Sequence, residues 1–183
     1  MIVGWDGVSA EPYHADNEPM ASCLDASLAP RVSRGRLDLM GIPIQVTFDA
    51  ADPAAQADFW AEALGYVIQP PPAGYGSWDD WATAMEIPEE NWNDARALVD
   101  PDGNGPRLFF QRVPEGKTAK NRVHLDVNAG GGHDVEYPDR VDAVDHHVDH
   151  LLDLGATKID VSSQRGEYWV VLQDPEGNEF CVQ

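Results

Sequence analysis

The chain has 183 residues and a formal net charge of −20, which results from 32 acidic and 12 basic residues. Contacts to phosphate groups need Lys and Arg side chains, so this charge argues against binding to nucleic acids and to anionic membrane surfaces. Because 43% of the residues are hydrophobic, the chain can bury a core. Its length suits one domain or two small fused modules.

Cysteine content and hydropathy indicate the cellular compartment of the protein. The two cysteines, Cys23 and Cys181, are too few for a disulfide framework, which fits a reducing compartment. No stretch approaches the roughly 18 apolar residues that a membrane-spanning helix needs. Residues 1–20 lack the basic region and the apolar core of a secretory signal. We therefore expect a cytoplasmic protein.

Residues 1–39 show no sustained hydrophobic period and are dominated by Gly, Pro, Ser, Ala and Asp. This composition predicts a flexible N-terminal extension. The first convincing strand comes directly after Met40, so we expect the folded unit to span residues 40–183.

The first strand is predicted over residues 42–48, where apolar and polar side chains alternate. A helix should follow, because Asp52 suits the N-cap position, Pro53 the first helical position and Gly65 the C-terminal stop. Further strands are predicted over residues 66–69, 97–99 and 107–113. On the first strand, one face carries Ile44, Val46 and Phe48, and the other carries Gln45, Thr47 and Asp49.

A Trp-rich, acidic stretch over residues 73–96 interrupts this half of the chain. Ser77 is a candidate cap for one short helix, and Pro88 is a candidate start of another. The tryptophans either pack an insertion onto the sheet or form a lid or an aromatic wall over a pocket.

The second half begins with a predicted strand over residues 122–128, whose polar face carries His124 and Asp126. A helix with an apolar stripe is predicted over residues 139–154. Its histidines, His146, His147 and His150, stand among aspartates, so we expect them on a solvated face. Three further strands are predicted over residues 157–161, 168–173 and 179–183, with Glu179 and Cys181 on the polar face of the last one.

The two halves have the same order of elements. Each also places an Asp-Pro-acid-Gly-Asn turn before its final strand, at residues 100–104 and 174–178. An internal duplication explains this agreement. We expect module one to span about 42–113 and module two about 121–183.

Several motifs, ADPAAQADFWAEALGY, DPDGNGPRLFFQRVPEGKTAKNRVHLDV and WVVLQDPEGNEF, resemble the vicinal oxygen chelate superfamily over residues 42–183. This superfamily includes glyoxalase I, the bleomycin-resistance proteins and the extradiol dioxygenases, and the longest of the three motifs is similar to its glyoxalase-like subgroup. The resemblance implies an α+β fold of paired βαβββ modules, which form a cupped eight-stranded mixed sheet with the helices outside. It also implies a ligand cavity inside the sheet and a homodimer.

The resemblance further implies a divalent metal site, for Ni, Zn, Mn or Fe, in that cavity. Gln45, His124 and Glu179 match three of the family's four ligand positions. The fourth position falls on Arg107 or Leu108, and neither side chain binds metals. Glu179 would also transfer the proton. No glycine-rich nucleotide motif is visible, so we expect no nucleotide or organic cofactor.

Two functions are favoured by the sequence, and a third interpretation, in which aromatic side chains fill the cavity and the domain is an interaction module, also stays open. One is a metal-dependent lyase or isomerase acting on a small oxygenated metabolite, with the metal as Lewis acid. The other is a metal-free binding protein that sequesters a small molecule, as bleomycin-resistance proteins do. In that case the cavity carboxylates Asp49, Asp126 and Glu179 would suit a cationic ligand. Extradiol dioxygenase chemistry is disfavoured, because it needs two histidines and a carboxylate around Fe(II).

A basic cluster enters the central strand of module two through Lys117, Lys120, Asn121 and Arg122. It is either a salt-bridged structural loop or a recognition site for an anionic group at the rim of the cavity. We include Lys117, Lys120 and Asn121 among the predicted cavity residues.

Overall fold

The computed structural model describes residues 42–183, so the predicted extension over residues 1–39 lies outside the described residues. Within the described part, residues 71–86 form one compact unit, and residues 42–70 together with 87–183 form the other. None of the helices between residues 42 and 183 combines the length and the apolar character that crossing a bilayer requires.

The first sheet contains four strands in the order β1-β4-β3-β2. Strands β1 and β4 are parallel, and the other neighbours are antiparallel. The elements of this half are β1 (Gln45–Ala50), helix α2 (Pro53–Leu64), β2 (Val67–Ile68), the short 3-10 helix η2 (Glu89–Asn91), β3 (Ala95–Val99) and β4 (Arg107–Arg112).

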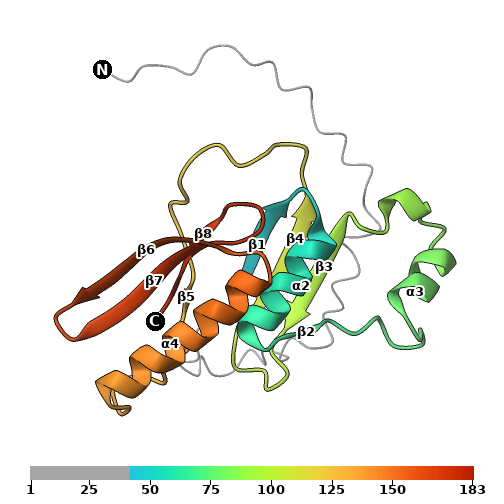
Figure 1. Ribbon diagram of the computed structural model, residues 1–183. Helices are drawn as coiled ribbons and strands as arrows, with labels where there is room; N and C mark the ends of the chain where they lie inside the picture. Colours follow the sequence, from blue (N-terminus) through green and yellow to red (C-terminus); the bar gives the residue numbers. More distant parts are fainter. Residues whose placement is uncertain (1–41) are drawn as a thin grey trace. The chain divides into compact units, whose positions relative to one another are not determined.

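The second sheet repeats this topology in the order β5-β8-β7-β6, again with one parallel pair, β5 and β8. Figure 1 shows α2 and α4 side by side. The structure confirms the α+β class and the paired modules, and the strands of residues 42–183 divide into two four-stranded mixed sheets. The elements are β5 (Asp126–Val127), α4 (Tyr137–Asp153), β6 (Thr157–Gln164), β7 (Glu167–Gln173) and β8 (Glu179–Val182).

Helix α2 follows from local signals that the sequence displays. The Asp52 side chain accepts a hydrogen bond from the Ala55 backbone N–H at 3.2 Å, and Pro53 occupies the first helical position. Gly65 ends the helix in the left-handed region, with φ of 65°, where a side chain would be strained. The predicted start and end of this helix are therefore confirmed.

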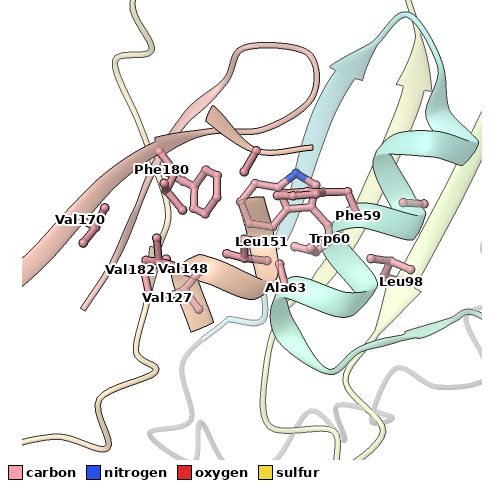
Figure 2. Close-up of a cluster of buried hydrophobic side chains, with 14 of the residues drawn as sticks. Phe59, Trp60, Ala63, Leu98, Val127, Val148, Leu151, Val170, Phe180 and Val182 are labelled. Atoms are coloured by element: carbon pink, nitrogen blue, oxygen red, sulfur yellow. The ribbon is translucent and has the colours of Figure 1, made fainter. Parts of the chain in front are cut away.

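The aromatic core joins the two modules. Trp60 of α2 is 1% exposed. Its ring centroid lies 5.2 Å from that of Phe48, 5.7 Å from that of Phe59 and 5.0 Å from that of Phe180. Since Phe180 belongs to β8, this cluster, of which Figure 2 labels Phe59, Trp60 and Phe180, connects the first module to the second.

The predicted strand over residues 122–128 is wrong for its first half. Only Asp126 and Val127 form β5, and Val123, which we expected on the apolar face, is 80% exposed. Main-chain pairing with β8 begins at Leu125, whose carbonyl accepts from the Cys181 N–H at 2.9 Å. Four residues before Leu125, the Asn121 N–H donates a hydrogen bond to the Glu179 side chain. The segment that leads into β5 is therefore held by a side chain and not by main-chain pairing with β8.

Strand β6 is longer than predicted, because the chain forms a tight hairpin into β7. Arg165 and Gly166 take up φ of 57° and 82° at the turn. Two consecutive positive φ angles are typical of the two-residue turns that suit the twist of a hairpin. Our prediction ended this strand at residue 161, since the polar residues SSQR gave no strand signal.

Residues 71–86 contain helix α3 (Trp78–Ala84). As predicted, Ser77 caps it, and its Oγ accepts from the Asp80 N–H at 3.0 Å. The rings of Trp78 and Trp81 meet edge to face, 5.4 Å apart. Whether this unit packs as an insertion or closes over a pocket stays a prediction.

Candidate functional site

The second sheet gathers three potential metal ligands beside β5 and β8. Asp126 and Cys181 are paired residues of the two parallel strands, and His124 precedes Asp126 by two positions. One ligand atom from each residue lies within 4.8 Å of the other two. The His124 Nε2 atom is 3.4 Å from the Asp126 Oδ1 atom. We call these three residues the His124 cluster.

The thiol of the His124 cluster is protonated in the absence of a cation. Burial, with the neighbouring Asp126 carboxylate, raises the pKa of Cys181 to about 11. Lys120 acts in the opposite direction, because its positive charge lowers the pKa of this thiol. A bound metal ion would favour the thiolate more strongly than Lys120 does.

Glu179 is held as an ionised carboxylate. Its Oε2 atom accepts from the Asn121 backbone N–H at 3.0 Å and lies 2.9 Å from the Lys117 Nζ atom. The Asn121 N–H, followed by the Lys117 ammonium group, lowers the pKa of Glu179 to about 2. A general base works best with a pKa near the operating pH, so Glu179 is a weak proton acceptor in this arrangement. The ion pair supports the salt-bridged interpretation for Lys117.

The first sheet places Gln45 and Arg107 side by side on β1 and β4. The Arg107 Nη1 atom donates to Gln45 Oε1, and Arg107 Nε donates to Gln69 Oε1 at 2.6 Å. Leu108 is 1% exposed and belongs to the core. The residue paired with Gln45 is therefore Arg107, whereas Leu108 is paired with Val46.

Asp49, a predicted cavity residue, lies four residue pairs further along the same strands. Its Oδ1 atom accepts from the Gln111 Nε2 atom at 2.8 Å. Asp49, Gln45 and Thr47 are all exposed on the polar face, as the alternation of the strand predicts.

The metal set expected from the resemblance stays a prediction. Its residues already have other partners, because Gln45 accepts from Arg107 and Glu179 from Lys117. A guanidinium group beside a ligand position also repels a cation. As they stand, these groups do not fit a divalent ion, whereas the His124 cluster offers an imidazole nitrogen, a carboxylate oxygen and a sulfur atom.

A cleft of about 770 Å³ opens beside the His124 cluster. It is lined by Tyr66 and Pro106 from the first module, by Asp126 from β5, and by His146 and His147 from α4. This volume is in the range of small-molecule sites. Asp126 is thus shared by the cleft and the His124 cluster.

His147 corrects our expectation of a solvated histidine face on α4. Its Nε2 atom lies 3.0 Å from the Ala63 carbonyl oxygen, at the end of α2. Burial lowers the pKa of His147, which keeps the ring neutral. His147 directly precedes Val148, which belongs to the buried apolar stripe of α4. This position explains why the His147 side chain reaches α2.

Sequence reasoning missed two residues of the candidate site. Cys181 alternates along the strand with Phe180 and Val182, which are buried in the core. This alternation predicted that Cys181 lies on the same face as Glu179, but it could not show that Cys181 pairs with Asp126 of β5. Arg107 was noticed only as a residue unsuited to metals. Its partners come from β1 and from the residue after β2, so no local pattern could reveal them.

Comparisons with known proteins agree with this geometry. A family model described as "Glyoxalase-like domain" matches residues 45–183. A glyoxalase/bleomycin resistance protein/dioxygenase family enzyme from Burkholderia phytofirmans PsJN is 19% identical, with a TM-score of 0.50 over 75% of this chain and 94% of that chain. The fosfomycin resistance protein FosX from Listeria monocytogenes is 9% identical, with a TM-score of 0.51 over 79% of this chain and 91% of that chain. No curated protein matches the chain.

Proposed function

The chain belongs to the glyoxalase-like domain family, and from this premise we propose that it is a metal-dependent lyase or isomerase acting on a small oxygenated metabolite. The ligands that we propose are His124, Asp126 and Cys181. The observation that carries this proposal is the approach of their ligand atoms to within 4.8 Å, next to a cleft that Asp126 also lines.

The donor atoms of the His124 cluster suit a borderline metal ion such as Zn(II), Ni(II) or Fe(II). When bound, such an ion supplies Lewis-acid polarisation of neighbouring substrate oxygens. His124 and Asp126 are exposed and Cys181 is 9% exposed, so the cluster is open on one side. Catalytic metal sites keep such an open position for water or substrate.

Proton transfer in this reaction needs a group that titrates near neutral pH. Glu179, which we predicted for this role, would have to lose both the Asn121 N–H hydrogen bond and the Lys117 ion pair before its pKa returns to its ordinary value. A substrate anion that binds Lys117 would remove the ion pair, and a shift of the Asn121 backbone would remove the hydrogen bond. Glu179 therefore stays a candidate only in the substrate-bound protein.

Metal content tests the proposal. The protein is stripped with chelator, dialysed against Zn(II), Ni(II), Mn(II) and Fe(II) in separate samples, and analysed for bound metal. We expect near-stoichiometric metal in the wild type and its loss in His124→Ala and Cys181→Ser. His133→Ala is the matched control, because this histidine is 82% exposed and lies outside the cluster. A cobalt-substituted sample should show a thiolate charge-transfer band that Cys181→Ser removes.

The same samples distinguish the two ligand sets. If Gln45→Ala and Glu179→Gln lose the metal while Cys181→Ser retains it, the set expected from the resemblance is correct and the His124 cluster is not the site. Metal-loaded protein is then screened with α-ketoaldehyde–thiol adducts, and turnover should disappear in the variants that lose the metal.

A metal-free binding protein is the second candidate function. The observation that favours it is that Glu179 and Gln45 are already satisfied by Lys117 and Arg107, so these polar groups need no ion. Wild-type protein without metal above background, for every ion tested, would establish this alternative and exclude the metal-dependent reaction.

Homodimerisation, expected from the resemblance, is part of the proposal. Strand β6 is the edge of the second sheet, and Ile159 and Val161 are 51% and 44% exposed on it. Light scattering coupled to size exclusion measures the mass in solution, and a monomer at all concentrations would contradict this part.

A further inference from the structure

Arg107 stands on the face of the first sheet that turns away from the core. It is the first residue of β4, and the next residue, Leu108, is buried in the core cluster. Because side chains alternate along a strand, Arg107 and Phe109 share the opposite face. The side chain of Arg107 is half-buried there.

Neutral groups hold the Arg107 guanidinium. Gln45 Oε1 accepts from Nη1, and Gln69 Oε1 accepts from Nε at 2.6 Å. The Cζ atom lies 5.1 Å from the centroid of the Phe109 ring. These contacts fix the orientation of the guanidinium, but none of them brings a negative charge.

Within residues 42–183, Arg107 pairs with no carboxylate, and its Nη2 atom has no hydrogen-bond partner. A half-buried cation without a counter-charge loses hydration free energy, which a bound anion would offset. Three other cations do have carboxylate partners: Arg112 with Asp94 at 3.4 Å, Arg140 with Glu167 at 3.5 Å and Lys117 with Glu179 at 2.9 Å.

We propose that Arg107 anchors a binding site for a small oxyanion, the carboxylate or phosphonate group of a small metabolite, and that Gln45 and Gln69 orient it. A planar guanidinium group donates two parallel hydrogen bonds to such a group. The two glutamines engage the Nε hydrogen and one Nη1 hydrogen, which leaves one Nη1 hydrogen and both Nη2 hydrogens for the ligand. Because its residues lie on β1 and β4 and directly after β2, this site goes beyond the proposed metal centre and is tested without it.

Calorimetric titration of metal-free protein tests the site. The probes are pyruvate, which presents a planar carboxylate, and methylphosphonate, which presents a tetrahedral oxyanion, at matched ionic strength. We expect saturable binding of at least one probe to the wild type, and the better probe identifies the class of oxyanion. Arg107→Gln should weaken binding by about tenfold or more, and Arg107→Lys by less, since lysine keeps the charge but not the fork.

Arg112→Gln is the matched control, because Arg112 lies on the same strand but is already paired with Asp94. It should bind the probe like the wild type. If Arg107→Gln does not fold, Gln69→Leu, which keeps the charge and removes one orienting contact, should also weaken binding. No saturable binding to the wild type, or equal losses in Arg107→Gln and Arg112→Gln, would overturn the proposal. Binding of the probe by protein that never takes up metal would separate this site from the proposed metal function.

Discussion

The indole nitrogen of Trp60 donates a hydrogen bond to the Oδ2 atom of Asp174 at 3.2 Å. Trp60 belongs to the helix of the first module, and Asp174 begins the last turn of the second. Both side chains are almost fully buried, at 1% and 2% exposure. This contact and the aromatic cluster around Trp60 hold the two modules together.

Asp174→Ala should lower the free energy of unfolding by about 3 kcal/mol, because buried donors would lose their acceptor. The Oδ1 atom of Asp174 also accepts from the backbone N–H groups of Glu176, at 3.0 Å, and Asn178, at 2.9 Å. Urea denaturation followed by tryptophan fluorescence measures the change.

Asp100→Ala is the internal control for this substitution. Asp100 makes the same contacts in the duplicated turn, to the N–H groups of Asp102 and Asn104 at 2.9 Å, but its turn is largely exposed. The loss should be clearly smaller than that for Asp174→Ala, since water replaces the acceptor. Equal losses of unfolding free energy at both positions would show that burial and the Trp60 contact do not contribute to the stability that Asp174 provides.

Asp126→Asn should accelerate alkylation of Cys181. Burial and the Asp126 carboxylate raise the pKa of the thiol to about 11, so little thiolate exists at neutral pH. Removing the negative charge lowers this pKa and increases the thiolate fraction. The measurement is the iodoacetamide rate between pH 7 and 9 in a Cys23→Ser background, and an unchanged or slower rate would contradict the assigned influence of Asp126.

The Glu179 interactions should stabilise the fold above about pH 4.5 and lose this effect in acid. The folded-state pKa is about 2, against an ordinary value of 4.5. Between these values the unfolded chain takes up a proton that the folded chain does not, so stability falls as pH decreases. Denaturation midpoints at pH 7, 4.5 and 3 should decline more in the wild type than in Glu179→Gln. Parallel pH profiles would contradict this interpretation.

His147 should make stability fall as the pH drops below about 6.5. Burial lowers the pKa of the folded-state ring below its ordinary value of 6.5. Protonation therefore favours the unfolded chain, and the contribution is complete only above that pH. Thermal denaturation of His147→Gln between pH 5 and 8 should show a weaker pH dependence than the wild type, whereas His133→Gln, at an exposed site, should retain it.

Local signals predicted the helices better than the strands. The start and end of α2 depend on Asp52, Pro53 and Gly65, which act within a few residues of the chain. The segment that enters β5 is held by Glu179, more than 50 residues away, which accepts a hydrogen bond from the Asn121 N–H. A strand needs a partner, and alternation alone does not show where pairing begins.

Taken alone, the sequence determined the α+β class, the duplicated modules and the family, because hydrophobic period, caps and turns are encoded in short segments. It also placed Gln45, His124 and Glu179 on polar faces. Only the tertiary structure decided which groups meet: Arg107 with Gln45 and Gln69, Lys117 with Glu179, and Cys181 with Asp126. The physical reason is that these contacts join residues from separate strands and loops, so their distances depend on sheet register and on the packing of the modules.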